Sequence, residues 1–450
     1  MIRPPHPRHL FAILACVALL PFNAAMAYQT ADLAGPWRFH ALASGPGQPW
    51  WERVTATIAS GGAASGYSIT SAGDSSSIAA TIAVGSTGLV TLAGLPQFRG
   101  ALDVDHTVMP GTDLWSGFAA GTTELRVGVK TAAPYALADI AGTWELQSVA
   151  SGPGAPWWLR GRVTVATNGG FSGNFAESDG SSSPTSGTLG LASDGTVTLV
   201  GAPVARGALD GGRSVFAMTN TWSGFGAGTT ELTLALKMAA TYAASDLAGT
   251  WEASILGTGP GAPWWSRGTI AIAANGTCTG TLTDNSGATE SVSGTLSVSA
   301  TGVVTRSGAP NARGALDQGH SVMVVTDTWA TGSPGTTEMF VAVRTGWPGP
   351  TDVPSAAPLA LALEPVSPNP TRGATPVIRF ALASSAPAQL ELLDIAGRSV
   401  TSREVGAMGA GRHTIALGPT TGMRSGLYWV RLRQGSEVRV TRVVVLENAP

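Results

Sequence analysis

The chain has 450 residues and a formal net charge of −2, with 12% charged residues, 44% hydrophobic residues and 59 glycines. This balance indicates folded, turn-rich β structure, because disordered chains combine low hydrophobicity with high net charge. The near-neutral charge argues against a nucleic-acid partner, which would need a basic surface. A chain of this length is expected to hold about three or more domains of ~150 residues.

The first 27 residues have the parts of a secretory signal peptide. Two arginines precede an apolar run at residues 10–20, and the string AMA at residues 25–27 matches a cleavage site. The apolar run is too short to span a bilayer, so no transmembrane segment is expected after cleavage. An alternative interpretation treats residues 13–16 as a lipoprotein box. Cleavage would leave a single cysteine, Cys278, so no disulfide is expected within the chain.

Three copies of one module follow the predicted signal peptide. Trp37, Trp144 and Trp251 open matching strings and lie 107 residues apart, and other landmarks repeat at the same interval without insertion. The predicted organisation is a signal peptide at 1–27, modules at 28–134, 135–241 and 242–347, a Pro/Ala linker at 348–364 and a C-terminal domain at 365–450.

Each module is predicted to be an antiparallel β-barrel of about eight strands. In the middle copy, apolar and polar residues alternate with the period of a strand, and Asn-Gly or Asp-Gly turns begin at Asn168, Asp194 and Asp210. Longer segments at 151–158, 177–187, 201–207 and 222–228 alternate with these turns, which places the long loops at one end, the mouth. A β-sandwich is the alternative. Because each copy has a complete strand set, each is expected to fold independently.

The module resembles the lipocalin-like (calycin) barrels. In that superfamily a Gly-x-Trp motif begins the first strand at the closed end, and a basic side chain from the last strand covers the indole. This chain has Gly-x-Trp at residues 35–37, 142–144 and 249–251, with a basic residue near the end of each copy. The resemblance implies three barrel-closing pairs: Trp37 with Lys130, Trp144 with Lys237, and Trp251 with Arg344.

Further tryptophans are candidate ligand-binding residues at the mouths. Each copy has a tryptophan pair in its first long segment (GQPWWER, GAPWWLR and GAPWWSR) and one tryptophan in its last. First and last strands are neighbours in a closed barrel, so these indoles are expected to converge. One of each pair would plug the barrel and the other would form a platform; alternatively, both are plugs. The candidates are Trp50, Trp51, Trp115, Trp157, Trp158, Trp222, Trp264, Trp265 and Trp329.

The sequence gives no support for catalysis. Nucleophile elbows, metal-binding histidine motifs and phosphate loops are absent, so no catalytic residue, metal or cofactor is predicted. Two positions of the repeat are acidic in all three copies, and each set of three is called an acidic column. Asp103, Asp210 and Asp317 are expected to pair with the arginines four residues before them. Glu124, Glu231 and Glu338 open the last strand, and a glycosidase carboxylate pair with the aspartates is the residual enzymatic hypothesis.

The C-terminal 80 or so residues contain PNP at 368–370, LELLDIAGRSV at 390–400, and the strands SGLYWVRL at 425–432 and RVTRVVVL at 439–446. This tail resembles the immunoglobulin-like C-terminal sorting domains of type IX secretion cargo and the related domain of the flagellar hook-cap protein. The family usually has Lys near the end, where this chain has Arg439 and Arg442. The resemblance implies export through the periplasm of a Gram-negative cell, with the type IX machinery as partner. The alternative is an ordinary adhesive immunoglobulin-like domain.

Two functional hypotheses follow. The first is a secreted or cell-surface protein whose modules bind a glycan or an apolar ligand through aromatic mouths. The second is a structural or adhesive surface array with no small-molecule ligand.

Overall fold

The computed structural model describes residues 27–45, 49–115, 120–153, 156–223, 226–259, 261–330, 334–347, 361–364, 366, 369–372, 377–384, 386–408, 411–416 and 424–446. They belong to two compact units with a boundary between residues 352 and 353. The expected signal peptide up to residue 26 and the linker from 348 to 360 lie outside the described residues. No helix in the described part of the chain is long and apolar enough to cross a membrane.

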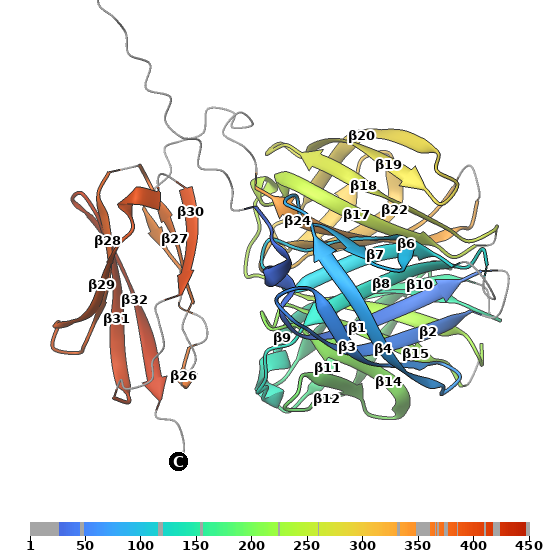
Figure 1. Cartoon of the computed structure of the whole chain (residues 1–450), viewed down its shortest axis with the longest axis horizontal. Coiled ribbons are helices and arrows are strands. Elements are labelled where there is room, and N and C mark those ends of the chain that lie inside the picture. The colour runs from blue at the N-terminus through green and yellow to red at the C-terminus, as the bar shows by residue number, and fades with distance from the viewer. Residues whose placement is uncertain are drawn as a thin grey trace, which may run out of the picture. The chain divides into compact units, whose positions relative to one another are not determined.

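The first unit contains three closed eight-stranded antiparallel barrels (Figure 1), which confirms the predicted all-β class. Barrel 1 consists of β1 (Gly35–Ser44), β2 (Trp50–Ile58), β3 (Ala63–Thr70), β4 (Ser75–Val84), β5 (Leu89–Leu92), β6 (Leu95–Ala101), β7 (Val108–Leu114) and β8 (Thr123–Lys130). Barrel 2 consists of β9 (Gly142–Ser151), β10 (Trp157–Val165), β11 (Gly170–Glu177), β12 (Ser182–Leu191), β13 (Thr196–Leu199), β14 (Ala202–Leu209), β15 (Val215–Thr221) and β16 (Thr230–Lys237). Barrel 3 consists of β17 (Gly249–Gly257), β18 (Trp264–Ile272), β19 (Thr277–Asp284), β20 (Thr289–Val298), β21 (Val303–Arg306), β22 (Ala309–Leu316), β23 (Val322–Thr328) and β24 (Thr337–Gly346).

The strands extend further into the predicted loops than the turn residues indicated. Most of the segment 177–187 belongs to β12 and most of 201–207 belongs to β14, so only short turns remain between the flanking strands. Residues 182–188 of β12 pair with β11 on one side and with no described strand on the other. Pro184 is tolerated in this part of β12 because a proline there interrupts no strand pairing on the open side. The tryptophan pair also lies in a strand, since Trp157 and Trp158 begin β10.

A short 3₁₀ helix covers the closed end of each barrel. These are η1 (Thr30–Leu33), η3 (Leu137–Ile140) and η4 (Ala244–Leu247). The indole of the first-strand tryptophan is fully buried, and its Nε1 donates a hydrogen bond of 2.7–2.8 Å to the last carbonyl of that helix in all three barrels. The tryptophan therefore attaches the helix to the closed end of the barrel.

The basic residue of the last strand reaches the same closed end. Lys130 and Lys237 donate to the Asp32 and Asp139 carbonyl oxygens at 2.9 and 3.1 Å, and Arg344 donates to the Asp246 carbonyl. Cations lie over two of the indoles, with Lys237 Nζ 5.6 Å from the Trp144 ring and the Arg344 guanidinium 4.7 Å from Trp251. In barrel 1, Lys130 lies opposite Trp37 in the strand register.

The leucines beside Lys237 do not line the barrel interior. Leu232, Leu234 and Leu236 belong to one continuous buried core with residues of barrels 1 and 3. Lys237 has the opposite alternation and so faces inward, toward Trp144. Both faces of β16 are therefore buried, one inside the barrel and one between barrels.

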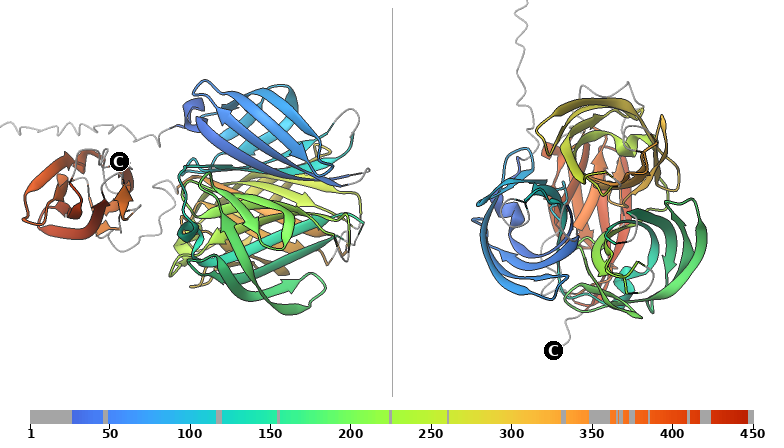
Figure 2. Two further views of the ribbon diagram at one scale, coloured as in Figure 1. Left: turned by 90° about the horizontal axis from the view of Figure 1, so that it is seen from below. Right: turned by 90° about the vertical axis from the view of Figure 1, so that its right-hand side faces the viewer.

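This shared core lies where the three barrels meet around one central axis (Figure 2, right). Equivalent positions of each copy supply it, for example Val127, Leu234 and Val341, all at most 1% exposed. The expectation that each module folds independently assumed that its contacts are local. The shared core contradicts that assumption, because an isolated barrel would expose an apolar face to water.

Three interface arginines, Arg53, Arg160 and Arg267, connect each barrel to the next in a closed ring. Each donates to backbone carbonyls of the following barrel: Arg53 to Thr219 at 2.7 Å, Arg160 to Thr326 at 3.1 Å, and Arg267 to Thr112 at 3.1 Å. Backbone hydrogen bonds repeat the cycle at the closed ends, from Gly211 to the Lys130 carbonyl, Gln318 to Lys237 and Val104 to Arg344. Barrel 3 thus returns to barrel 1 and leaves no terminal copy.

One position breaks this symmetry and allows a stability prediction. Trp51 Nε1 and Trp158 Nε1 each donate to a threonine of the next barrel, Thr221 and Thr328, at 2.6 Å. The equivalent residue at the third interface is Leu114, and Trp265 Nε1 is buried there with no hydrogen-bond partner among the described residues. The Leu114→Thr substitution should supply the missing acceptor and stabilise the unit by about 0.5–1.5 kcal/mol.

Urea unfolding of the Leu114→Thr variant, followed by circular dichroism, measures this gain. Thr221→Leu is the matched control and should destabilise the protein, because it orphans the buried Nε1 of Trp51. A Leu114→Thr variant no more stable than the parent would show that the third interface does not repeat the other two.

The second unit is a two-sheet β-sandwich. Its sheets have the strand orders β25-β27-β30 and β26-β32-β31-β28-β29. The strands are β25 (Ala362–Leu363), β26 (Thr371–Arg372), β27 (Val377–Leu382), β28 (Ala388–Leu393), β29 (Ser399–Glu404), β30 (Gly411–Ala416), β31 (Gly426–Gln434) and β32 (Glu437–Leu446), with the short helix η5 (Gly406–Met408). Side chains from both sheets, such as Phe380 and Val430, share one core. The predicted closing hairpin is β31–β32.

Candidate functional site

The first tryptophan of each pair lies at the barrel mouth. Trp50 is opposite Ala43 near the end of β1, and its ring packs edge-to-face against Trp115 with centroids 5.1 Å apart. The equivalent ring pairs are Trp157 with Trp222, at 5.5 Å, and Trp264 with Trp329, at 5.2 Å. The mouth pairs are therefore Trp50–Trp115, Trp157–Trp222 and Trp264–Trp329.

A buried glutamate holds the second ring of each mouth pair. The Nε1 atoms of Trp115, Trp222 and Trp329 donate to Glu124, Glu231 and Glu338 at 2.7, 2.9 and 2.7 Å. This bond fixes the ring orientation while part of the indole stays accessible, since Trp222 is 39% and Trp329 is 36% exposed. An oriented, half-exposed indole has a flat apolar face available for a ligand.

The second tryptophan of each pair lies elsewhere. Trp51, Trp158 and Trp265 point out of their own barrels into the ring interfaces, where they are 4%, 5% and 3% exposed. The interface arginine two residues later stacks on each ring, for example Arg160 on Trp158 at 4.0 Å. These three residues are therefore interface residues, and the expectation that all the candidate tryptophans converge at the mouths is wrong for them.

The three mouths open on the same face of the unit. Ser44 and Ser151, the last residues of β1 and β9, bring their hydroxyl oxygens within 2.6 Å of each other, and the closed ends meet through Gly211 and Lys130. Barrels 1 and 2 therefore point the same way, and the cyclic contacts extend this to barrel 3. Figure 2 shows the parallel arrangement.

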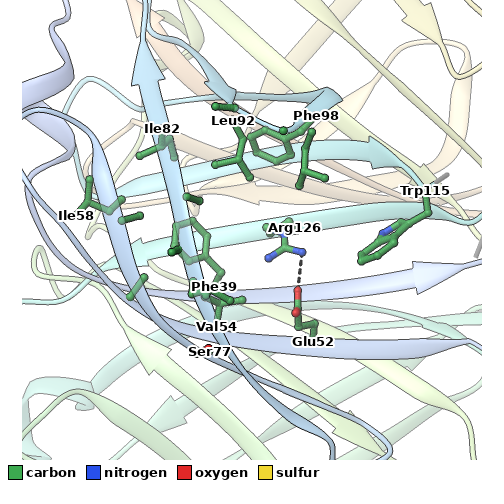
Figure 3. A pocket seen from close by; sticks show the side chains of 18 residues that line it. Phe39, Glu52, Val54, Ile58, Ser77, Ile82, Leu92, Phe98, Trp115 and Arg126 are labelled. Carbon is green, nitrogen blue, oxygen red and sulfur yellow. Dashed lines mark hydrogen bonds and ion pairs between the residues drawn. The ribbon is translucent and has the colours of Figure 1, made fainter. Parts of the chain in front are cut away.

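Barrel 1 also contains a cavity of about 440 Å³ beneath its mouth (Figure 3). Aliphatic and aromatic side chains form most of its wall, including Phe39, Val54 and Phe98. Trp115 lines the mouth end, and Ile58 lies toward the closed end in Figure 3. This volume is within the usual range of about 300–1,000 Å³ for small-molecule sites.

A charged cluster lies inside this apolar cavity. The Arg126 guanidinium contacts Glu52 and Glu124 at 2.7 Å each. Both carboxylates raise the pKa of Arg126, which keeps the guanidinium charged despite the burial that acts against it. Burial raises the pKa of Glu124, although Arg126 opposes this. Glu52 and Arg126 both line the cavity, so a ligand there would meet ionic groups as well as apolar walls.

Barrels 2 and 3 do not repeat this chemistry. Where barrel 1 has Glu52, they have Leu159 and Ser266; where it has Arg126, they have Thr233 and Phe340. Neither residue of the ion pair was predicted from the sequence. A position-by-position comparison of the three copies would have found the pair. A charged residue at an inward-facing strand position of a barrel is costly to bury unless it has a partner.

The two acidic columns lie at opposite ends of each barrel. Asp103 accepts hydrogen bonds from the Thr107 and Val108 amides and so closes the β6–β7 turn, while Glu124 lies at the mouth. Asp210 and Asp317 close the equivalent turns of barrels 2 and 3. The two columns therefore do not form carboxylate pairs, and no ion pair joins Asp103 to Arg99 in the described structure. The described residues contain no group of three His, Cys, Asp or Glu side chains that could hold a metal.

The mouth glutamate of barrel 3 predicts a pH dependence. Burial raises the pKa of Glu338 from 4.5 to about 7, although the Trp329 hydrogen bond opposes this. The unfolded chain loses this proton at lower pH than the folded protein does. The contribution of Glu338 to stability is therefore complete below pH about 4.5 and is lost as the pH rises through about 7. Urea midpoints at about pH 5 and about pH 8 should differ less for Glu338→Gln than for the parent protein. Equal differences would show that Glu338 titrates normally.

Comparison with known proteins finds structural likeness only. No family model and no curated protein matches the chain. A DUF3598-family protein of unknown function from Nostoc punctiforme is 10% identical, with 47% of this chain and 99% of that chain covered and a TM-score of 0.18. A mutant transferrin-binding protein B from Haemophilus parasuis is 10% identical, with 72% and 77% covered and a TM-score of 0.23. Transferrin-binding protein B from Neisseria meningitidis is 11% identical, with 66% and 63% covered and a TM-score of 0.22.

Proposed function

We propose that this is a secreted or cell-surface binding protein whose three mouths engage a repetitive glycan together. The observation that carries the proposal is the set of three oriented mouth pairs on one face. Indole faces pack well against the apolar face of a sugar ring, and the second ring of each mouth pair packs against the first, edge-to-face in barrels 1 and 2 and tilted in barrel 3. Three weak sites on one rigid face convert low single-site affinity into useful avidity when the ligand repeats.

The alternative is a structural or adhesive array in which all the tryptophans are packing residues. The buried interface residues Trp51, Trp158 and Trp265 fit that description. The mouth pairs do not fit it as well, because Trp222 and Trp329 stay more than a third exposed.

A polysaccharide retention assay separates the two. The triple variant Trp50→Ala, Trp157→Ala, Trp264→Ala should lose retention on whichever of cellulose, chitin, xylan and β-1,3-glucan binds the parent protein. Trp347→Ala is the matched control, since that indole is 51% exposed but stacks on Arg344 at the closed end. Retention that survives in the triple variant, or failure of the parent protein to bind any of the four, would favour the structural array.

The C-terminal sandwich supports an export role within the same proposal. Its two sheets and its closing β31–β32 hairpin agree with the resemblance to type IX sorting domains. We infer that the predicted signal peptide directs the chain to the periplasm and that the sandwich is the address read by the type IX machinery.

Deletion of residues 364–450 is therefore expected to trap the protein in the periplasm of a host that has a type IX system. The barrels are a separate compact unit and should remain folded after the deletion. Cell fractionation with an antibody against the barrels measures the outcome. Normal surface delivery of the truncated chain would contradict the export role.

A further inference from the structure

The interior of barrel 1 is open where barrel 2 is filled. Phe171 projects into barrel 2 opposite Gly187, and a Cβ on that glycine would come within 2.7 Å of the Phe171 ring. The equivalent pair in barrel 1 is Ala64 opposite Ala80, and both alanines line the cavity. The difference between the two barrels at this place is therefore a phenyl ring.

The charged cluster leaves one carboxylate oxygen for a ligand. Glu124 accepts from Arg126 through Oε1 and from Trp115 through Oε2. Glu52 accepts from Arg126 through Oε2, and no described residue donates to its Oε1. The cluster sets two carboxyl groups against one guanidinium, whose Nη1 has no hydrogen-bond acceptor among the described residues, so it is the excess of carboxyl groups that favours a cationic ligand at Glu52 Oε1. A hydrogen-bond donor, and a cation above all, suits that atom.

The cavity also has an entrance that does not depend on the mouth. On the side away from β3, β4 pairs with β5 only through residues 82–84, so residues 75–80 have no strand partner there in the described structure. Ser77 and Ala79 line the cavity from one side of this gap, and Gly94 and Leu95 line it from the other. We therefore place the entrance for a small molecule between β4 and the β5–β6 hairpin.

We propose that barrel 1 binds a small apolar molecule with a protonated amine, the amine on Glu52 and the apolar part among Phe39, Val54 and Phe98. This proposal rests on the proposed function only in treating the barrels as ligand carriers. It assigns barrel 1 a ligand and a location different from those of the mouths.

Displacement of a neutral fluorescent probe, N-phenyl-1-naphthylamine, tests it on the intact protein. Octylamine should displace the probe at a concentration about tenfold lower than octanoate does, because only the amine makes a charge-assisted hydrogen bond to Glu52. Octanol should lie between them. Equal displacement by octylamine and octanoate, or stronger displacement by octanoate, would overturn the proposed ligand class.

Variants that copy one barrel into another locate the site. The double variant Ala64→Phe, Ala80→Gly gives barrel 1 the filling pair of barrel 2 and should abolish high-affinity probe binding. The reciprocal variant Phe171→Ala should open a second probe site in barrel 2, where Leu159 and Thr233 replace the ion pair, so that site should show no preference for the amine. Unchanged probe binding in the double variant would show that the probe does not occupy barrel 1.

The Glu52→Gln variant tests the role of the carboxylate. In this variant, octylamine should displace the probe no better than octanol does, while the probe itself still binds. Retention on polysaccharide is measured on the same variants. If the double variant loses the probe but keeps polysaccharide retention, the two functions are separate. If the parent protein is retained on none of the polysaccharides but still prefers the amine, the proposed function has failed and this proposal stands. An amine preference that survives Glu52→Gln would overturn the assignment to Glu52.

Discussion

Barrel 2 expressed alone, as residues 135–241, is expected not to give a cooperatively folded soluble monomer. Isolation exposes five large apolar side chains that are fully buried in the shared core: Val149, Val215, Leu232, Leu234 and Leu236. Burying such a side chain contributes about 1.5–3 kcal/mol, so their joint exposure is comparable with the ~5–15 kcal/mol total stability of an ordinary domain.

The matched control for the isolated barrel is the three-barrel unit, residues 28–347. It should unfold in one cooperative transition, because the shared core and the closed ring of interface arginines couple its barrels. Circular dichroism during urea unfolding, with sedimentation to establish the oligomeric state, compares the two. A monomeric isolated barrel 2 with a sharp transition and a stability of several kcal/mol would show that the shared core contributes little.

The Trp144→Ala substitution is expected to destabilise the protein by about 3–5 kcal/mol, the usual cost of removing a fully buried large aromatic side chain. Trp144 is 0% exposed, packs against Phe216 and donates to the Ile140 carbonyl. Its loss would leave a cavity and also detach η3 from the closed end of the barrel.

The Trp222→Ala substitution is the control for the Trp144 measurement, because Trp222 is partly exposed at the mouth and should cost much less. The free energies come from urea unfolding of both variants beside the parent protein. A loss below about 1 kcal/mol for Trp144→Ala would mean that this indole does not hold the closed end together.

Local patterns in the sequence predicted the barrels well. The period-two alternation and the Asn-Gly and Asp-Gly turns report contacts between neighbouring strands, and the Trp144 column marks the closed end. What the alternation does not show is which face of a strand is inside. In β16 both faces are apolar, with Leu234 outward and Ala235 inward, and only the packing of three barrels explains why.

The same limit explains why the prediction that both tryptophans of each pair lie at the mouth was wrong. Adjacent residues in a strand point to opposite faces, so Trp157 and Trp158 could not both be at the mouth once the pair begins β10. In a loop, by contrast, the two rings could both have reached the mouth. The partner surface of Trp158 comes from barrel 3, 170 residues away in the chain at Thr328, and no local pattern carries that information.

The cavity of barrel 1 depends on a comparison between copies. Each of Glu52, Ala64 and Arg126 is unremarkable in its own segment. Their meaning comes from the residues at the same positions in barrel 2, Leu159, Phe171 and Thr233, and from the register that turns all of them inward.

The dissociation rate from an immobilised polysaccharide tests the central claim, three mouths acting together on one face, most directly. Surface plasmon resonance compares the intact protein with variants that lack one, two or three of Trp50, Trp157 and Trp264, on the polysaccharide that best retains the parent protein. If the three mouths act together, each removal speeds dissociation further, with a combined effect on apparent affinity of about 10²–10⁴. Dissociation that is the same for the parent protein and all three variants would contradict it.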